Sequence, residues 1–210
     1  QIIAELDALC ETGWAGDVFF VDDNFIGNKR HLKEDLLPAL IEWRKDNPGM
    51  SFQTEASINL ADDDRLMELM VKAGFRMVFV GIETPDAAAL AECNKKQNEN
   101  RDLIADVKKM QRTGLQVQGG FIVGFDSDGP SVFERQIEFI QRSGIVTAMV
   151  GLLQAPKGTK LYKRMEEEGR ICGTDSGDNV EGTTNILTRM DPDTLYAGYR
   201  HILNYIYAPK

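Results

Sequence analysis

The sequence predicts an α/β fold, a partial parallel (β/α) barrel that is followed by a helical extension. One observation is that short apolar runs alternate with segments of helical periodicity. Another is a recurring pattern of a polar residue, a small residue, glycine and an apolar residue, which is typical of a helix that ends and leads into a strand. The third is that acidic and amide residues directly follow the apolar runs, where parallel α/β folds carry their functional groups.

Five apolar runs are predicted to be strands. They are Val18–Val21, Ser51–Ala56, Met77–Ile82, Gln116–Val123 and Val146–Leu153. The first run leads into the segment V-F-F-V-D-D-N-F, and its continuous apolar character favours a strand that is buried on both faces. Strand and helix repeat at roughly thirty to forty residues per unit, which favours right-handed crossover connections and therefore a parallel sheet.

The connecting segments are predicted to be helices. Their ends are marked by four glycines, Gly13, Gly74, Gly114 and Gly144. Apolar residues recur at helical spacing before these glycines, and the segment 131–134 has the pattern of a capping box. A further helix is predicted around Leu32–Lys45, with Pro38 in its middle as the one residue that argues against a continuous helix.

The pattern changes after Leu153. A charged helix is predicted at Lys160–Glu168, ended by Gly169, and a polar loop at Gly173–Thr184. The chain then forms an amphipathic helix at Asp191–Tyr207, which packs either on this domain or on a part outside this sequence. We therefore expect residues 1–170 to form the partial barrel and residues 171–210 to form a loop with a C-terminal helix.

Composition limits the class of protein. The 210 residues are 42% hydrophobic and 27% charged, as in soluble globular proteins, and no run approaches the roughly 18 apolar residues of a transmembrane helix. A net charge of -9 without a basic stripe argues against binding to nucleic acid. Three isolated cysteines indicate reduced thiols and a cytoplasmic location. Gln1 opens the chain without Met and within a predicted helix, so we expect a segment of a longer protein.

Polar side chains are predicted to gather at the carboxyl ends of the strands. Because these ends meet at one face of a parallel barrel, their carboxylates would share one pocket. Such a pocket fits a divalent metal, or a ligand with ammonium and hydroxyl groups, unless Arg and Lys from neighbouring loops neutralise it. Gly119, Gly120 and Gly124 indicate either a flat ring against the strand or a β-bulge. His31 and His201 lie away from the strand ends, which makes a histidine-cluster hydrolase improbable.

These segments resemble the radical S-adenosylmethionine (SAM) superfamily, and most closely its members with an N-terminal cobalamin-binding domain. V-F-F-V-D-D-N-F at 18–25 resembles the second barrel strand, whose carboxylates replace the Gly-Gly-Glu motif that holds the SAM amino group. G-I-E-T at 81–84 is similar to the fourth-strand segment near the SAM ribose and methionine groups. Gly120-x-Ile122-x-Gly124 resembles the fifth-strand motif behind the adenine, with Ser127 where the family has Glu. L-Q-A-P-K-G-T at 153–159 resembles the sixth-strand segment and its turn.

The resemblance implies the C-terminal part of a radical SAM barrel that lacks its first strand. The implied enzyme cleaves SAM to a 5′-deoxyadenosyl radical and uses it in an oxidoreductase or a cobalamin-dependent methyltransferase reaction. Its cofactors are SAM, a 4Fe–4S cluster and cobalamin, with the cluster cysteines and the cobalamin domain outside this segment. The segment alone is therefore expected to be inactive. The resemblance assigns no catalytic or metal-binding residue here. It implies SAM contacts from Asp22, Asp23, Glu55, Ser57, Glu83, Thr84, Gly120, Ile122, Gly124 and Gln154.

The implied partners are a small-molecule or lipid-like substrate, the cobalamin domain of the same chain, and an electron donor such as flavodoxin or ferredoxin. Two alternatives remain open from the residues themselves. One is a divalent-metal-dependent (β/α)-barrel lyase or aldolase with Glu55 and Glu83 on Mg²⁺ or Mn²⁺. The other is a non-enzymatic scaffold whose terminal helix docks a partner.

Overall fold

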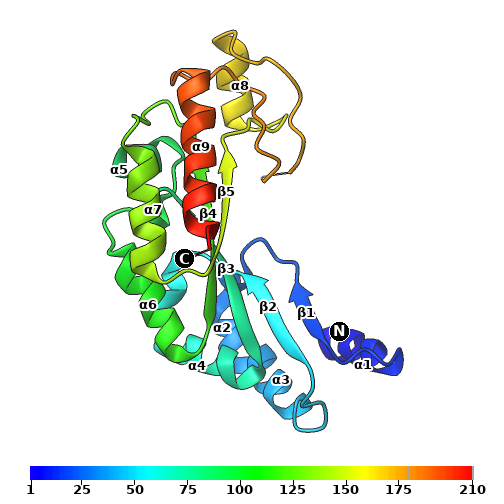
Figure 1. Ribbon diagram of the computed structural model, residues 1–210. Helices are drawn as coiled ribbons and strands as arrows, with labels where there is room; N and C mark the ends of the chain where they lie inside the picture. The colour runs from blue at the N-terminus through cyan, green and yellow to red at the C-terminus, as the bar shows by residue number, and fades with distance from the viewer. Residues whose placement is uncertain (179, 210) are drawn as a thin grey trace. The chain divides into compact units, whose positions relative to one another are not determined.

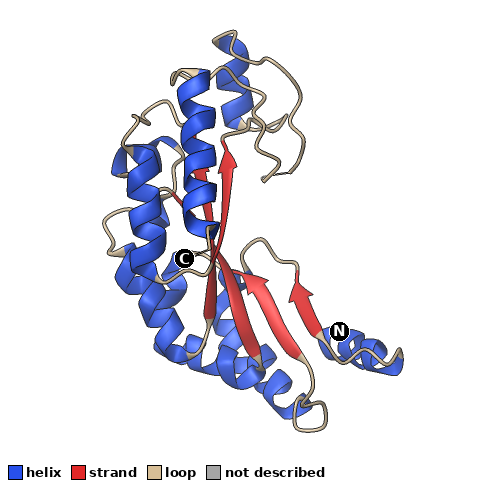
Figure 2. Ribbon diagram, viewed as in Figure 1, coloured by secondary structure: helices blue, strands red, loops and turns tan. Residues whose placement is uncertain are grey.

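The computed structural model describes residues 1–178 and 180–209. Five parallel strands form one sheet in the order β1-β2-β3-β4-β5, as the α/β prediction requires (Figure 1, Figure 2). The strands are β1 Asp17–Phe20, β2 Ser51–Glu55, β3 Phe75–Glu83, β4 Gln116–Val123 and β5 Thr147–Leu152. The α-helices are α1 Ile2–Glu11, α2 Lys29–His31, α3 Leu37–Trp43, α4 Asp64–Ala73, α5 Ala87–Glu92, α6 Leu103–Thr113, α7 Val132–Ser143, α8 Lys160–Glu167 and α9 Pro192–Tyr207. Short 3₁₀ turns lie at Phe25–Asn28, Ile58–Asp62 and Lys96–Asn98.

The chain divides into two compact units. Residues 1–80 and 105–118 form the first unit, and residues 81–104 with the chain from Gly119 onward form the second. The boundary expected after residue 170 stays a prediction.

The glycines mark the helix ends as predicted. Gly74 and Gly144 are the left-handed C-caps of α4 and α7, with φ of 102° and 74°. Gly13 and Gly114 also have positive φ, at 82° and 111°. Glycine adopts this conformation without a Cβ clash, so it satisfies the last helical carbonyls while the chain turns toward the next strand.

A core of aromatic rings holds the first unit together. The rings of Phe20, Phe25, Phe52 and Phe75 lie with centroids 5.0–5.5 Å apart and come from β1, β2, β3 and the turn after β1. Such offset and edge-on contacts add to the burial of apolar area. Strands β1 and β2 are parallel, with Val18 opposite Phe52.

Strand β1 is not buried on both faces, contrary to the prediction. Phe19 is 45% exposed and Val21, just after the strand, is 79% exposed. The physical reason is position: β1 is an edge strand of the sheet, and its side chains alternate between an exposed and a half-buried face.

Pro38 does not break the second helix, which contains a π-helical turn just before it. A π-helical turn at Leu32–Leu36 precedes α3, and Pro38 occupies the first turn of α3. Proline has no N–H to donate and its ring crowds the preceding turn, so the backbone widens just before it.

In the second unit, α9 packs on α7 of the same chain, which decides between the two placements that the sequence left open. Leu195, Tyr199 and Ile202 form its buried face. The two helices lie side by side in Figure 1. Near the end of α9, the Tyr207 hydroxyl donates to the Ala148 carbonyl at 2.7 Å and accepts from its N–H at 3.1 Å. This side chain therefore satisfies both backbone groups of Ala148 in β5.

The predicted capping box at the start of α7 is wrong. Ser131 makes no side-chain cap, and Glu134 instead accepts a hydrogen bond from His201 Nε2 at 2.9 Å. The local pattern was overridden by the contact between α7 and α9.

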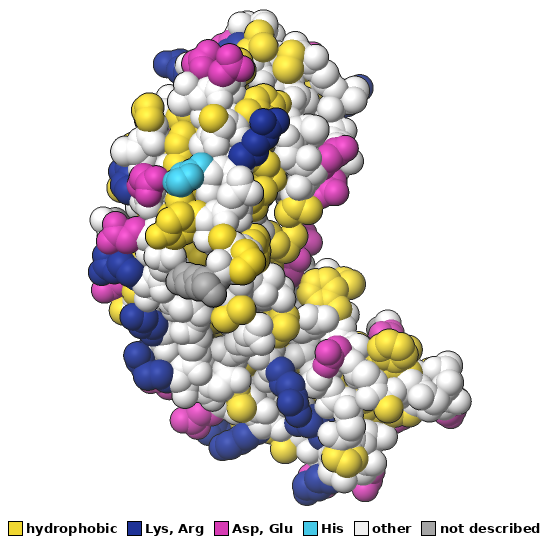
Figure 3. All heavy atoms as spheres, viewed as in Figure 1, with side chains coloured by type: hydrophobic (Ala, Val, Ile, Leu, Met, Phe, Trp, Pro, Cys, Tyr) yellow, Lys and Arg dark blue, Asp and Glu magenta, His cyan; other side chains and the backbone are white. Residues whose placement is uncertain are grey.

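No helix of the described residues combines the length and hydropathy that a transmembrane span requires. On the face drawn in Figure 3, Lys and Arg side chains are interspersed with Asp and Glu side chains.

Candidate functional site

In the first unit, Asn24 joins the ends of β1 and β2. Its Oδ1 accepts hydrogen bonds from the N–H and the hydroxyl of Ser57, at 3.1 and 3.2 Å. The Ser57 hydroxyl also lies 2.7 Å from Asn59 Oδ1, and Lys29 Nζ donates to the Asn59 carbonyl at 2.9 Å. An amide that bridges two strand ends holds the loop after β1 in place.

The paired carboxylates before Asn24 are exposed. Neither the Asp22 nor the Asp23 side chain forms a hydrogen bond or ion pair within the part of the chain that the structure describes. Glu55, the last residue of β2, is half-buried. These acids therefore lie at the strand ends where the sequence placed them, and Asp22 and Asp23 are open to an external cation.

In the second unit, Glu83 ends β3 in an unusual conformation. Its φ of 65° is one of three positive values among the described residues other than glycine. A side chain in this region costs roughly 1–3 kcal/mol, so surrounding contacts must hold it there. The contact is an ion pair: Lys95 Nζ lies 2.5 Å from Glu83 Oε1, with the Glu83 side chain 16% exposed.

Gly81 provides the space for this ion pair. A Cβ on Gly81 would lie 2.5 Å from Glu83 Oε1 and 2.8 Å from Lys95 Nζ. The Glu83–Lys95 pair occupies the space beside Gly81, which explains why the first residue of the G-I-E-T segment is glycine. The buried Asn98 lies next to it and donates to the carbonyls of Gly81 and Ile82, at 3.1 and 3.0 Å.

Thr84 follows in the chain and is fully buried. Its hydroxyl accepts a hydrogen bond from the Asp86 N–H at 3.2 Å, and Asp86 in turn caps α5 through Ala88 and Ala89. The Thr84 side chain therefore supports the turn after β3.

In the glycine-rich strand β4, side chains of the protein itself occupy the space beside one glycine. A Cβ on Gly119 would lie 2.7 Å from the Phe121 ring and 2.9 Å from Ile145. Gly124, just after the strand, has φ of 109° and needs glycine for that reason. Gly120 is half-buried, and Ile122 packs against the apolar cluster described below.

A charged network holds the loop after β4. Arg170 donates to both oxygens of Asp126, at 2.9 and 2.6 Å, and Arg164 lies 3.4 Å from the same carboxylate. Hydrogen bonds from Arg170 hold the pKa of Asp126 below its usual value, against the opposing effect of burial. Lys95 therefore neutralises Glu83, and Arg170 neutralises Asp126. Neutralisation of strand-end acids by Lys and Arg was one of the alternatives that the sequence left open.

A carboxylate from α5 binds the loop at Ser127. Glu92 accepts hydrogen bonds from the backbone N–H groups of Asp126 and Ser127, both at 3.1 Å, and from the Ser127 hydroxyl at 3.0 Å. It also pairs with Arg164 at 3.1 Å. No local pattern could have identified Glu92, because it lies 35 residues before Ser127.

Asp128 is a carboxylate with an altered pKa. Its Oδ2 accepts the N–H groups of Gly124 and Phe125 at 2.8 and 3.0 Å, while its buried Oδ1 has no partner among the described residues. Burial raises the pKa of Asp128 to about 6, against the lowering effect of the two backbone bonds. Asp86 and Glu92 raise it further by repulsion.

Asp128 predicts a pH dependence of stability. The unfolded chain releases this proton near pH 3.8, whereas the folded chain holds it to about pH 6. Stability should therefore fall as the pH rises between these values and then level off. Asp128→Asn has no such titration. The unfolding free energy of Asp128→Asn minus that of the wild type should therefore increase between pH 4 and 6. Urea unfolding at pH 4, 5, 6 and 7 measures this difference, and parallel pH profiles would contradict it.

Gln154 binds the loop after α8. Its amide nitrogen donates to the Ser176 hydroxyl at 3.3 Å and to the Asp178 carbonyl at 3.0 Å, and its oxygen accepts the Ser176 N–H at 3.1 Å. The side chain therefore positions the loop that was predicted at Gly173–Thr184.

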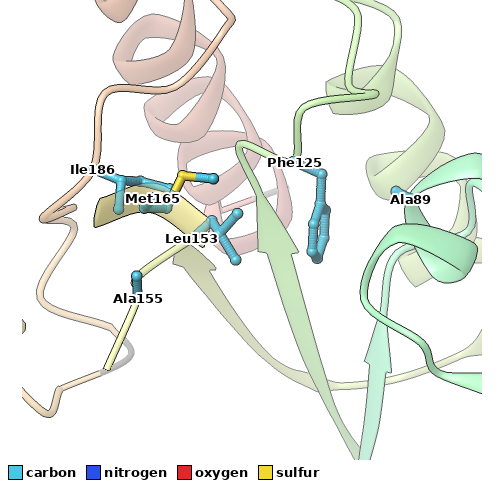
Figure 4. Packing of buried hydrophobic residues seen from close by; sticks show 6 residues of the cluster. All are labelled: Ala89, Phe125, Leu153, Ala155, Met165 and Ile186. Atoms are coloured by element: carbon cyan, nitrogen blue, oxygen red, sulfur yellow. The ribbon is translucent and has the colours of Figure 1, made fainter. Parts of the chain in front are cut away.

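An apolar cluster lies at the ends of β4 and β5. Figure 4 shows its six members, Ala89, Phe125, Leu153, Ala155, Met165 and Ile186. Beside it opens a pocket of about 440 Å³ with a mainly apolar surface, lined by Phe125, Leu153, Leu161 and Cys93 and, at polar positions, by Glu92, Asn94, Lys160 and Arg164. Volumes of this size accommodate small molecules.

Local sequence patterns missed three functional candidates in this unit. Lys95, Asn98 and Glu92 each act on a strand end that is more than ten residues away. Cys10, Cys93 and Cys172 are free, and the described residues contain no group of three or more His, Cys, Asp or Glu side chains placed to hold a metal ion.

Comparison with known proteins identifies relatives among methyltransferases. The chain is 39% identical to the hopanoid C-2 methylase of Rhodopseudomonas palustris over 212 residues, which cover 100% of this chain and 39% of the methylase. It is 43% identical to an uncharacterized methyltransferase of Synechocystis over 88% of this chain and 34% of that protein. The chain thus spans between a third and two fifths of these relatives. Residues 159–210 match a domain of unknown function, DUF4070.

The fold is that of known radical SAM enzymes. The radical SAM methyltransferase TsrM of Kitasatospora setae, solved with cobalamin and a 4Fe–4S cluster bound, matches 92% of this chain and 39% of its own, with a TM-score of 0.69 and 18% identity. The resemblance of strands β1, β3 and β4 to this superfamily is thus matched by the fold of the chain and by its methyltransferase relatives. The chain therefore has the fold of part of the radical SAM barrel, and its sequence is related to those of methyltransferases.

Proposed function

We propose that the whole protein is a radical SAM methyltransferase. The observation that carries this proposal is the 39% identity to a hopanoid methylase, because it extends over the full length of this chain. A shared fold alone would support many activities, whereas sequence similarity over the whole chain makes a shared activity the stronger inference. It favours methyl transfer over the lyase, aldolase and scaffold alternatives.

The strand ends of this chain fit SAM in their chemistry. SAM presents an ammonium group and ribose hydroxyls, and all of these donate hydrogen bonds to acceptors. Asp22 and Asp23 offer carboxylates without partners among the described residues, and Glu83 pairs with Lys95 through Oε1 only. We assign the amino group to Asp22 and Asp23, with Glu55 and Ser57 beside them.

The other assignments follow the resemblance. Glu83 and Thr84 serve the ribose and methionine groups, with Thr84 acting through its backbone, since its hydroxyl supports a turn. Gly120, Ile122 and Gly124 back the adenine, and Gln154 orders the loop that follows β5.

The remaining cofactors belong to other parts of the whole protein. The proposal places the 4Fe–4S ligands and a cobalamin domain in parts of the whole protein outside this chain, so we expect the chain alone to be inactive. When bound, the cluster and SAM supply radical chemistry, and cobalamin supplies a methyl carrier. Flavodoxin or ferredoxin would supply electrons.

The substrate is a small molecule with an apolar part, and not a nucleic acid. The apolar pocket beside Phe125 and Leu153 supports this proposal, since such surface binds apolar groups. The free cysteines suit a cytoplasmic protein.

The test uses the whole protein, purified without oxygen. Iron and sulfide content and SAM cleavage after reduction are measured together. About four irons per chain and formation of 5′-deoxyadenosine or of a methylated product are expected. Absence of both iron and SAM cleavage would overturn the proposed function.

Asp23→Ala tests the amino-group assignment in the same protein. Loss of a charge-assisted hydrogen bond costs about 1.5–3 kcal/mol, so SAM affinity should fall at least tenfold. Calorimetric titration with SAM measures the change, and Asp46→Ala, an exposed acid between α3 and β2, is the control. Equal SAM affinity in the Asp23→Ala variant and the wild type would refute the assignment.

A further inference from the structure

The second unit contains two side chains that act on the end of β3, Lys95 and Asn98, which we call the β3 clasp. We propose that Lys95 is a positioning residue for SAM binding, which holds Glu83 so that its second carboxylate oxygen accepts hydrogen bonds from SAM. This inference rests on the proposed function and names a residue that no motif of the sequence contains.

The end of α5 places Lys95 opposite Glu83. Asn94 has φ of 55° and follows the helix as its left-handed residue. Its N–H donates to the Ala91 carbonyl, and the Lys95 N–H donates to the Leu90 carbonyl at 3.0 Å. These two bonds are those of a Schellman turn, which reverses the chain and aims the next residue away from the helix.

The ion pair determines where the Glu83 carboxylate lies. Lys95 Nζ contacts Oε1 at 2.5 Å, and no described residue contacts Oε2. A carboxylate with one oxygen fixed by a cation retains the lone pairs of the other oxygen for a ligand donor. Without Lys95, the Glu83 side chain would sample several rotamers and lose this preorganisation.

The backbone beneath the pair is held as well. Asn98 donates to the carbonyls of Gly81 and Ile82, which precede Glu83, and so supports its positive φ. Gly81 leaves the space in which the pair lies. The clasp therefore fixes the backbone, the rotamer and the free oxygen of Glu83 together.

The experiment measures SAM affinity by titration in the whole protein, purified without oxygen, for Lys95→Met, Glu83→Gln and the double variant. Lys95→Met is expected to weaken SAM binding roughly tenfold, measured at a temperature at which the variant is fully folded. Because Lys95 acts through Glu83, the double variant should bind SAM no more weakly than Glu83→Gln alone. Lys95→Arg keeps a cation and should retain most of the affinity. Lys96→Met, at an exposed neighbouring lysine, is the matched control.

Hydrogen exchange provides a readout that is independent of SAM. Amides of residues 81–84 should exchange faster in Lys95→Met than in Lys96→Met. Unchanged SAM affinity in Lys95→Met, with weakened binding in Glu83→Gln, would overturn the positioning role and leave the proposed function standing. The positioning role would also be overturned if the loss of SAM affinity in the double variant equalled the sum of the losses in Lys95→Met and Glu83→Gln. A wild-type protein that does not bind SAM would overturn both.

Discussion

Asp126→Ala is expected to lower the unfolding free energy by about 3–5 kcal/mol, the usual cost of leaving a buried ion without its partner. The side chains of Asp126 and Arg170 are only 11% and 14% exposed. Without Asp126, the Arg170 guanidinium keeps only Glu168 as an ionic partner among the described residues. The loop after β4 would then lose its link to the chain that follows α8.

The measurement is urea unfolding, combined with hydrogen exchange of residues 159–178 and 180–209. Exchange in this part should rise in Asp126→Ala more than elsewhere in the second unit. Glu166→Gln is the matched control, because Glu166 is an exposed acid of α8. Equal unfolding free energies for Asp126→Ala and Glu166→Gln would contradict the prediction.

The effect of Asp126 should also depend on pH. Hydrogen bonds from Arg170 lower the pKa of Asp126 in the folded chain below the ordinary value of 3.8. The carboxylate therefore contributes stability above pH 3.8, and this contribution is lost as the pH falls through the lower pKa of the folded state. The difference between wild type and Asp126→Ala should hold at pH 5 to 7 and shrink below pH 4.

Gly198→Val is expected to cost about 3 kcal/mol, at the upper end of the usual range for overpacking a core. Gly198 is buried in α9, and a Cβ at this position would overlap the ring of Phe133 in α7. The gain in helix propensity over glycine is well below 1 kcal/mol for valine, so the steric term decides the sign.

A double variant identifies the cause of this loss. Phe133→Leu shortens the side chain opposite Gly198, so Gly198→Val should cost less in that background than in the wild type. Ala197→Val, on the exposed side of the same helix, is the control for helix propensity. Urea unfolding of the four proteins measures the coupling. A loss for Ala197→Val as large as that for Gly198→Val would refute steric contact as the cause.

Local physics explains why much of the fold could be predicted. A left-handed glycine at a helix end depends only on the residues beside it, so Gly74 and Gly144 marked the ends of α4 and α7 correctly. Apolar periodicity likewise depends on neighbours within one element. The exception among local patterns was Ser131, because the Glu134 side chain pairs with His201 on α9 instead.

The candidate site divides in the same way. Asp22, Asp23, Glu55 and Glu83 lie at strand ends as the sequence indicated, because a strand followed by polar residues ends where its apolar run ends. Which of these acids stays open was beyond local patterns. Lys95 and Arg170 neutralise Glu83 and Asp126 from 12 and 44 residues away in the chain.

The amino-acid sequence by itself determined the α/β alternation, the helix ends and the resemblance to radical SAM enzymes, because each depends on residues close together in the chain. Only the tertiary structure decided that β1 has an exposed face, that α9 packs on α7 and that Glu92 binds the loop at Ser127. These outcomes depend on which distant segments become neighbours, and therefore on the free energy of the folded chain as a whole.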